Sequence, residues 1–389
     1  MDVPVEPVKR TVTPYFNSFK AKIPHIGGPR KWVFVVSGVL AAVAVFIGVS
    51  LFIKGRNTGE MVRPIPYNEE LTGDIPERVI SPITGEYYQG QEAKDWWIRR
   101  PLAVMVNNHT DARPQSGLVD ADIVYEIVAE GGITRFLAFY LSETPVKIGP
   151  VRSTREYYLV LVKELGDAMI MHIGWSPQAL EAIETWPVRS LGRGAASFWR
   201  ENPRDVAIEH TAYVNGEDLY ARGLELGWEG KAPLEMWKFK DTDKYLDAPF
   251  SRNITIDFWY AGDYSSIWKY DPDKGSYLRF MGYDADANPI PHEDQETGEQ
   301  IEVKNLIVQF ADETTIEGDD KNRLDYQLLG SGKGFVFLDG RVVEVTWSKA
   351  ERDTRTRFYD INGAEMEFSR GKFWVSIVPS RNVEQVVFD

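Results

Sequence analysis

The sequence predicts an α+β fold. An N-terminal mixed α/β domain is followed by a mostly antiparallel, β-rich C-terminal domain, and one transmembrane helix precedes both. Three observations carry this prediction: residues 32–53 form an uncharged apolar run, residues 101–245 alternate strand-like and helix-like segments, and residues 250–389 hold short β-rich segments separated by turn residues. Alternating strand and helix patterns are typical of a mixed domain, whereas regularly spaced short strands are typical of antiparallel sheets.

The composition excludes several kinds of chemistry. The chain has 389 residues, 43% of them hydrophobic, which is enough for two or three domains with their own cores. Its net charge of −14 argues against nucleic-acid binding, which depends on neutralising phosphates. The absence of cysteine excludes disulfides, thiol catalysis, Cys-ligated zinc and a lipid-modified cysteine. Because the five histidines are spread along the chain, we expect no metal site, and we expect no cofactor.

The apolar run reads "WVFVVSGVLAAVAVFIGVSLFI" and spans residues 32–53. As a helix rising about 1.5 Å per residue, it reaches roughly 33 Å, enough for the hydrocarbon core of a bilayer. A cleavable signal peptide has an apolar region of about 7–15 residues that ends in a small-residue cleavage site. This run is longer and ends in Phe52-Ile53 followed by Lys54. We therefore expect an uncleaved membrane anchor rather than a signal peptide or a buried core helix.

The flanking charges predict the orientation of this anchor. Residues 1–31 hold six Lys or Arg residues and two acidic ones, a balance of +4. Basic flanks stay on the cytoplasmic side of a membrane. We expect residues 1–31 to be a basic cytoplasmic tail and the bulk of the chain to be extracytoplasmic. Residues 54–100, rich in Gly, Pro and charge without a stable period, predict a stalk or lead-in.

The N-terminal α/β domain, residues 101–245, begins with runs rich in β-branched and aromatic residues. Gly131-Gly132 between two such runs predicts a hairpin, and Ser176 before Pro177 predicts a capped helix start. In chain order we expect strands at 102–108, 122–128 and 135–141, a helix at 153–165, a strand at 168–174, and helices at 176–186 and 215–226.

The C-terminal domain, residues 250–389, contains strand-like runs from "ITIDFWY" to "KFWVSIVP" and no long helical period. Asp339-Gly340 and Asn362-Gly363 stand between such runs, where two-residue type I′ turns belong. We expect a mostly antiparallel sheet or sandwich that closes against the first domain.

The stretch "IGPVRSTREYY", residues 148–158, concentrates charge at a predicted helix start. Ser153 and Glu156 fit a capping box, with Ser153 as N-cap and Glu156 at the third helical position. Arg152 and Arg155 then lie where the helix dipole is already positive. Carboxylates from the neighbouring sheet or an anionic ligand must offset this charge.

Glu126 is the second feature that requires a partner. It shares a predicted strand face with Val124 and Val128, where an unpaired charge costs several kcal/mol. Glu130 lies about 13 Å further along the strand, too far for the carboxylate pair of a glycosidase. The candidate partners of Glu126 are Arg135, Arg152 and Arg155.

Several long blocks resemble a known family. "RPLAVMVNNHTDARPQSGLVDADIVYEIVAEGGITRFLAFYL" (100–141) with "IGPVRSTREYY" resembles the N-terminal domain of the YerB-like family of bacterial envelope proteins, and "TRFYDINGAEMEFSRGKFWVSIVP" (356–379) resembles its C-terminal domain. The resemblance implies a two-domain extracytoplasmic protein without a settled reaction. Many members look like lipoproteins, from which this chain departs by having no cysteine and an apolar anchor. The polar positions carried over as ligand-binding candidates are Asn107, Arg113, Gln115, Glu126, Glu130, Arg135, Arg152, Ser153 and Arg155.

Three hypotheses follow, and the sequence leaves open whether the protein is an enzyme. The first is a binding or scaffold protein, anchored once in the bacterial cell membrane. A cleft lined by Glu126, Arg135, Arg152 and Arg155 would hold an anionic cell-wall ligand or an envelope protein segment. The second is an envelope hydrolase or transferase with Glu126 or His172 as general base. The third makes the charged residues a structural salt-bridge network between sheet and helix.

Overall fold

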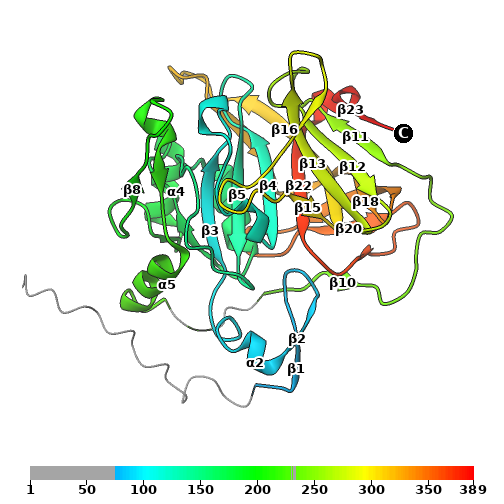
Figure 1. Cartoon of the computed structure of the whole chain (residues 1–389), viewed down its shortest axis with the longest axis horizontal. Coiled ribbons are helices and arrows are strands. Elements are labelled where there is room, and N and C mark those ends of the chain that lie inside the picture. The colour runs from blue at the N-terminus through cyan, green and yellow to red at the C-terminus, as the bar shows by residue number, and fades with distance from the viewer. Residues whose placement is uncertain (1–74, 229, 231–233) are drawn as a thin grey trace, which may run out of the picture. The chain divides into compact units, whose positions relative to one another are not determined.

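An 11-stranded sheet runs through both predicted domains (Figure 1). The computed structural model describes residues 75–228, 230 and 234–389, all of which belong to one unit, Glu69–Asp389. The strand order is β20 (Arg357–Asp360), β19 (Arg341–Lys349), β18 (Gly330–Leu338), β16 (Asn305–Thr315), β22 (Phe373–Pro379), β4 (Ile123–Val128), β5 (Thr134–Tyr140), β3 (Leu102–Asn107), β6 (Met169–Met171) and β7 (Arg189–Ser190), with β17 (Leu324–Gln327) paired to β16.

The centre of this sheet joins the two predicted domains edge to edge. Strand β4 pairs in parallel with β22, from Ile123 opposite Phe373 to Ile127 opposite Ile377, and antiparallel with β5. Strand β22 is also parallel to β16. Every residue of β4 and β22 is buried, which explains why both read as nearly continuous apolar runs. The fold is mixed and strand-rich, but its β-rich part is less purely antiparallel than the sequence predicts.

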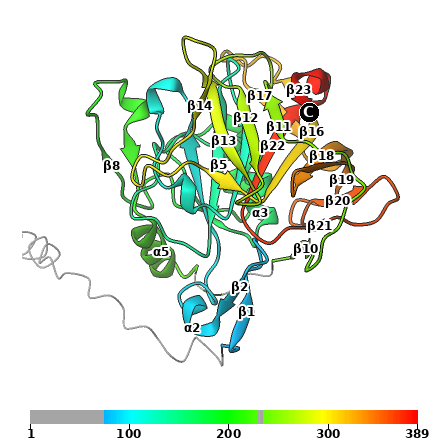
Figure 2. The same cartoon turned by 45° about the vertical axis from the view of Figure 1, so that its right-hand side comes forward.

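A smaller six-stranded sheet covers one face of the β4–β22 region (Figure 2). The contact is aromatic: the rings of Trp268 and Trp374 lie 5.4 Å apart at 63°, an edge-to-face arrangement. The strands of this smaller sheet are β14 (Pro289–Pro291), β13 (Ser276–Tyr283), β12 (Ser266–Asp271), β11 (Asn253–Ile256) and β23 (Val386–Phe388), with β15 (Glu302–Val303) paired to β13.

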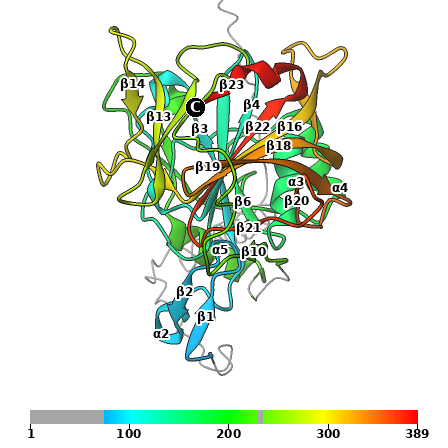
Figure 3. The ribbon, with the colours of Figure 1, turned by 90° about the vertical axis from the view of Figure 1, so that its right-hand side faces the viewer.

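Helices cover the opposite face (Figure 3), where α3 (Glu156–Glu164) and α4 (Pro177–Thr185) lie. The Tyr125 hydroxyl of β4 donates to Glu164 Oε1 of α3 at 3.1 Å, which fixes α3 to the sheet. The predicted start of α4 is confirmed, because Ser176 is the N-cap, accepts from the Ala179 N–H at 3.1 Å and precedes Pro177. The third predicted helix is α5 (Gly216–Glu225), capped by Asn215.

The remaining elements are short. The second half of the predicted lead-in carries a hairpin, β1 (Arg78–Ile80) and β2 (Tyr87–Gln89), followed by α2 (Gly90–Ala93). The others are the strands β8 (Trp199–Arg200), β9 (Ala212–Tyr213), β10 (Lys238–Phe239) and β21 (Glu367–Phe368), and the 3₁₀ turns η2 (Thr110–Ala112), η3 (Leu118–Asp120), η4 (Ile208–His210) and η5 (Ser380–Gln385).

One of the two predicted hairpin turns is confirmed and one is wrong. Asp339 and Gly340 have φ of 52° and 72° between β18 and β19, as a type I′ turn requires. At Asn362-Gly363 only Gly363 has a positive φ, of 78°. There the Asp360 carboxylate accepts from the N–H groups of Asn362 and Ala364, each at 2.9 Å, and holds a wider loop.

The predicted basic tail (1–31), membrane anchor (32–53) and first part of the lead-in (54–74) lie outside the described residues. Within residues 75–228, 230 and 234–389, no helix combines the length and apolar character needed to cross a membrane.

Candidate functional site

The parallel strands place their carboxyl ends at one edge of the large sheet. Strands β16, β22 and β4 run parallel, as do β3, β6 and β7, and β5 is antiparallel to both β3 and β4. Ligand sites of open α/β sheets lie outside the carboxyl ends of their strands. We define the carboxyl edge as the residues that follow β3, β4 and β6, the facing turn 208–210, and the segment 150–155.

Segment 150–155 ties these strand ends together. The Asn107 N–H at the end of β3 donates to Pro150 O at 2.8 Å, and the Ile173 N–H beyond β6 donates to Arg152 O at 3.1 Å. Arg135, at the start of β5, donates from Nη1 to Ser153 O at 2.9 Å. The segment is therefore held extended by three neighbours before α3 begins.

This tethering overturns the predicted capping box. Helix α3 starts at Glu156, its N-cap is Arg155 with φ −128° and ψ 161°, and no side chain caps it. The Ser153 hydroxyl instead donates to Ile173 O at 3.0 Å. Arg152 and Arg155 thus precede the helix rather than lying in its first turn, so the dipole adds less positive charge than the sequence suggested.

Glu130 supplies the negative charge that Arg155 requires. Its Oε1 accepts from Arg155 Nε at 2.5 Å and its Oε2 accepts from Arg135 Nη2 at 2.8 Å. Burial raises the pKa of Glu130, but the Arg155 hydrogen bond and the two positive charges outweigh it and lower the pKa below its usual value. Burial, followed by the neighbouring Arg155 charge, lowers the pKa of Arg135 to about 10. One carboxylate thus serves two guanidinium groups.

A second cluster lies on the β3 side of the carboxyl edge. The rings of His109 and His210 stack with centroids 4.4 Å apart, and Asn107 donates from Nδ2 to His210 Nδ1 at 2.7 Å. Arg152 Nη2 is 2.8 Å from Glu209 Oε1, and this pair is partly exposed, at 26% and 51% of the side chains. Burial, then the charge of His109, lowers the pKa of His210.

Three side chains of this cluster are close enough together to be possible ligands of a metal ion. Ligand atoms of His109, Asp111 and His210 lie within 4.8 Å of one another, a grouping that the sequence did not predict. The cluster nevertheless satisfies itself, because His109 Nδ1 accepts from the Asp111 N–H at 3.2 Å and His210 Nδ1 accepts from Asn107. A metal ion would have to displace these hydrogen bonds.

Glu126 does not belong to the carboxyl edge, which corrects two expectations. It is fully buried and pairs with Arg279 of β13 at 2.9 Å, not with Arg135, Arg152 or Arg155. Thr134 Oγ1 and Trp374 Nε1 also donate to it, at 2.9 and 3.0 Å. Glu126 pairs opposite Phe136, so it faces the smaller sheet, whereas Arg135 faces α3. A carboxylate with three donors and no exposure is not available as a general base.

The remaining predicted residues extend this buried network. His292 donates from Nε2 to Gln115 Oε1 at 2.8 Å, because its Nδ1 accepts from Arg279. Gln115 donates to Asn108 Oδ1 at 3.0 Å, and Arg113 donates to Asn108 O at 3.2 and 3.3 Å. The nine predicted residues therefore fall into three groups: Glu130, Arg135, Ser153 and Arg155; Asn107 and Arg152; and Arg113, Gln115 and Glu126.

The sequence did not lead us to Arg279 or His292 as members of this network, although it holds one signal for Arg279. In the run "SYLRFM", Arg279 lies in phase with Tyr277 and Met281, and all three are buried on the same face of β13. A charge at an inward position of a strand requires a buried partner. The sequence alone did not show that this partner is Glu126.

His172, the other candidate general base, is hydrogen-bonded through both ring nitrogens. Its Nε2 lies 2.8 Å from Ser190 Oγ and its Nδ1 lies 2.9 Å from Gly174 O. Burial lowers the pKa of His172 to about 4, so the ring is neutral at ordinary pH.

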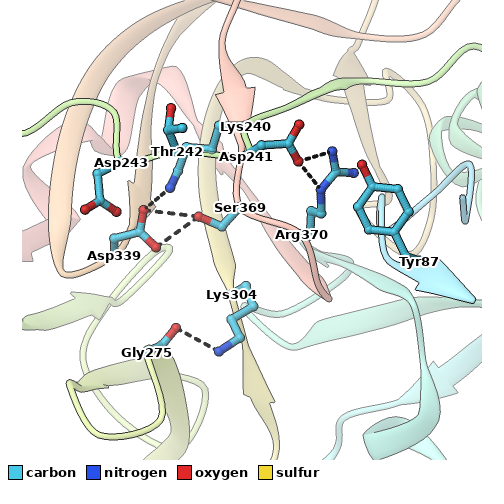
Figure 4. A pocket seen from close by; sticks show the side chains of 10 residues that line it. All are labelled: Tyr87, Lys240, Asp241, Thr242, Asp243, Gly275, Lys304, Asp339, Ser369 and Arg370. Atoms are coloured by element: carbon cyan, nitrogen blue, oxygen red, sulfur yellow. Dashed lines mark hydrogen bonds and ion pairs between the residues drawn. The ribbon is translucent and has the colours of Figure 1, made fainter.

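A separate polar pocket of about 450 Å³ lies near β10 and β21 (Figure 4). Lys240 Nζ meets Asp339 Oδ2 at 2.7 Å, and Arg370 Nη2 meets Asp241 Oδ1 at 2.7 Å. Three basic and three acidic side chains line it, so it carries no excess charge, and it includes none of the nine predicted residues.

Comparisons with known proteins give the family. The profile described as "Protein of unknown function (DUF3048) N-terminal domain" matches residues 83–229, and its "C-terminal domain" counterpart matches residues 254–375. The chain is 31% identical over 322 residues to "Putative lipoprotein YerB" of Bacillus subtilis, covering 82% of this chain and 92% of the relative. It is similar to the crystal structure of YerB from Bacillus subtilis with a TM-score of 0.67 and 30% identity, over 80% of this chain and 99% of that one. The chain belongs to the YerB-like family.

Proposed function

We propose that this chain is an extracytoplasmic binding or scaffold protein, held at the bacterial cell membrane, whose carboxyl edge takes an anionic ligand. Two features support the location: the apolar run at 32–53 and the name of the relative as a lipoprotein. The ligand is an anionic cell-wall polymer or an acidic segment of an envelope protein.

The charge balance of the carboxyl edge is the observation that supports an anionic ligand. In a chain of net charge −14, Arg135 and Arg155 share the single carboxylate of Glu130. Arg152 adds a third guanidinium, whose one ion pair within the described part of the chain is with the half-exposed Glu209. Arginine binds carboxylates and phosphates through parallel N–H donors, and a weakly held exposed partner is readily exchanged for a ligand.

Arg135 and Arg155 serve mainly to hold the edge together. Both side chains are only 9% exposed and their hydrogen bonds go to Glu130 and to backbone carbonyls. Arg152, at 26% exposure, is the group that can turn toward a ligand. The binding role therefore centres on Arg152, and the predicted cleft lined by Glu126 is replaced by this exposed edge.

Two variants with opposite effects test the proposal. In the full chain in detergent micelles, Arg152→Ala is expected to weaken binding of poly(glycerol phosphate), a teichoic-type polymer, by roughly 10- to 100-fold, the value of a charge-assisted hydrogen bond. Glu209→Ala removes the competing carboxylate and is expected to tighten binding. Titration calorimetry at two salt concentrations measures both.

Arg252→Ala is the matched control, because Arg252 is exposed just before β11 of the smaller sheet, outside the carboxyl edge. A ligand site at Arg152 gives opposite changes for the two edge variants and no change for the control. Equal affinities of the wild type and all three variants would remove the anion-binding proposal and leave the arginines a structural role.

A further inference from the structure

We propose that Ser190 and His172 form a nucleophile–base pair that cleaves oxygen esters by acyl transfer. This is an activity separate from anion binding at Arg152. The pair lies where the parallel strands β6 and β7 end: His172 directly follows β6 and Ser190 is the last residue of β7.

The hydrogen bonds assign the tautomer. Gly174 O can only accept, so His172 Nδ1 carries the proton of the 2.9 Å bond between them. His172 Nε2 then has a free lone pair and accepts the Ser190 hydroxyl proton at 2.8 Å. A base that accepts from the nucleophile and is oriented through its second nitrogen is the arrangement that activates a serine.

The loop after Ser190 approaches this hydrogen bond closely. A Cβ placed on Gly192 would lie 2.6 Å from His172 Nε2, so only glycine fits there. The backbone N–H groups of Gly192, Arg193 and Gly194 donate to no described residue. Unpaired amides beside a nucleophile are the donors that stabilise a tetrahedral oxyanion.

Two exposed side chains provide a surface for the alcohol part of the ester. Trp175 is 38% exposed and its ring stands edge-on to His172, with centroids 6.1 Å apart. The Arg193 guanidinium lies 5.9 Å from the Trp175 ring, is 41% exposed and pairs at 3.1 Å with Glu184, which is itself 52% exposed. A flat aromatic face with a cation beside it suits a polar or anionic alcohol, such as a sugar, carrying a small acyl group.

The chemistry balances with water as the only co-reactant. Ser190 Oγ attacks the ester carbonyl and its proton moves to His172 Nε2. The C–O bond to the alcohol breaks, and the alcohol leaves with that proton. Water then attacks the carbonyl carbon of the acyl-serine and gives a proton to His172 Nε2. The bond between Ser190 Oγ and the acyl carbon breaks, Oγ takes the proton from Nε2, and the carboxylic acid leaves.

The test is covalent labelling of the full chain in detergent micelles with a fluorophosphonate probe, together with p-nitrophenyl acetate turnover. Ser190→Ala is expected to abolish labelling, and His172→Gln to slow both reactions at least 100-fold, the range of general-base catalysis. Gly192→Ala, which pushes a methyl group against Nε2, is expected to behave like His172→Gln.

Ser331→Ala is the control, because this serine is exposed on β18, outside the carboxyl edge. It is expected to label and turn over like the wild type. A wild-type chain that takes no label, or equal labelling of Ser190→Ala, would overturn the proposal and make the hydrogen bond a structural link between β6 and β7. Binding of poly(glycerol phosphate) by the same variants is a separate readout, so failure here does not affect the Arg152 proposal.

Discussion

At the residue scale, His172 couples the folded state to pH. Its pKa is about 4 when folded, because burial penalises the charged ring, and about 6.5 in an unfolded chain. Between these values the unfolded chain binds the proton and the native chain does not. The neutral ring therefore contributes stability that is complete above about pH 6.5 and is lost as the pH falls toward 4.

The titration of His172 therefore makes the free energy of unfolding depend on pH to a measurable extent. The free energy of unfolding of the wild type is expected to drop by up to about 3 kcal/mol between pH 6.5 and 4 relative to His172→Gln, which cannot titrate. Urea denaturation of both proteins across this range measures the difference. Parallel curves for the two proteins would show that His172 titrates alike in the folded and unfolded states.

At the element scale, the contact between β4 and β13 is electrostatic as well as apolar. Glu126 and Arg279 are both fully buried and 2.9 Å apart. Removing one member leaves an uncompensated charge in the core, which costs more than the intact pair contributes. Arg279 also lies over the Trp374 ring at 4.2 Å, so its environment is held by stacking as well as by charge.

Glu126→Leu is expected to lower the free energy of unfolding by about 3–5 kcal/mol, because Arg279 would be buried without a counter-charge. The double variant Glu126→Leu with Arg279→Met is expected to lose less than the sum of the single losses. Chemical denaturation of the four proteins completes the cycle, with the exposed Glu299→Gln as control. Additive losses would contradict a direct ion pair.

The sequence predicted most elements of the α/β part because their signals are local. Runs rich in β-branched and aromatic residues gave β3, β4 and β5, and a Ser-Pro start gave α4 to within a residue. The start of α3 was misplaced because non-local hydrogen bonds to β3 and β6 hold segment 150–155 extended and outweigh the local capping pattern. The same limit explains why Ser190 was missed as the partner of His172, since the two meet only through the β6–β7 pairing.

At the scale of the whole molecule, two buried carboxylates join the predicted domains on opposite faces of the large sheet. Glu126 meets Arg279 on one face, and Glu164 of α3 meets Lys349 of β19 at 3.0 Å on the other. Together with the β4–β22 pairing, they connect the two parts through backbone, charge and packing. A boundary near residue 250 separates them in sequence but not in the sheet.

We therefore expect the described part of the chain to unfold in one cooperative transition. Near-ultraviolet and far-ultraviolet circular dichroism should give the same midpoint, because neither part keeps its central strand pairing without the other. Residues 75–245 expressed alone are expected to remain unfolded. Two separate transitions, or a folded 75–245 fragment, would show that the parts are independent.

The place of β22 has a consequence for how the protein is made. Its partners in the middle of the sheet, β4 and β16, both precede it in the chain, and β4 comes from the opposite end of the folded region. During synthesis, β4 keeps an open apolar edge until residues 373–379 emerge from the ribosome. The pairing of β22 with β4 and β16 therefore forms last. A chain released from the ribosome before β22 has been made is prone to aggregation and does not form a shorter folded protein.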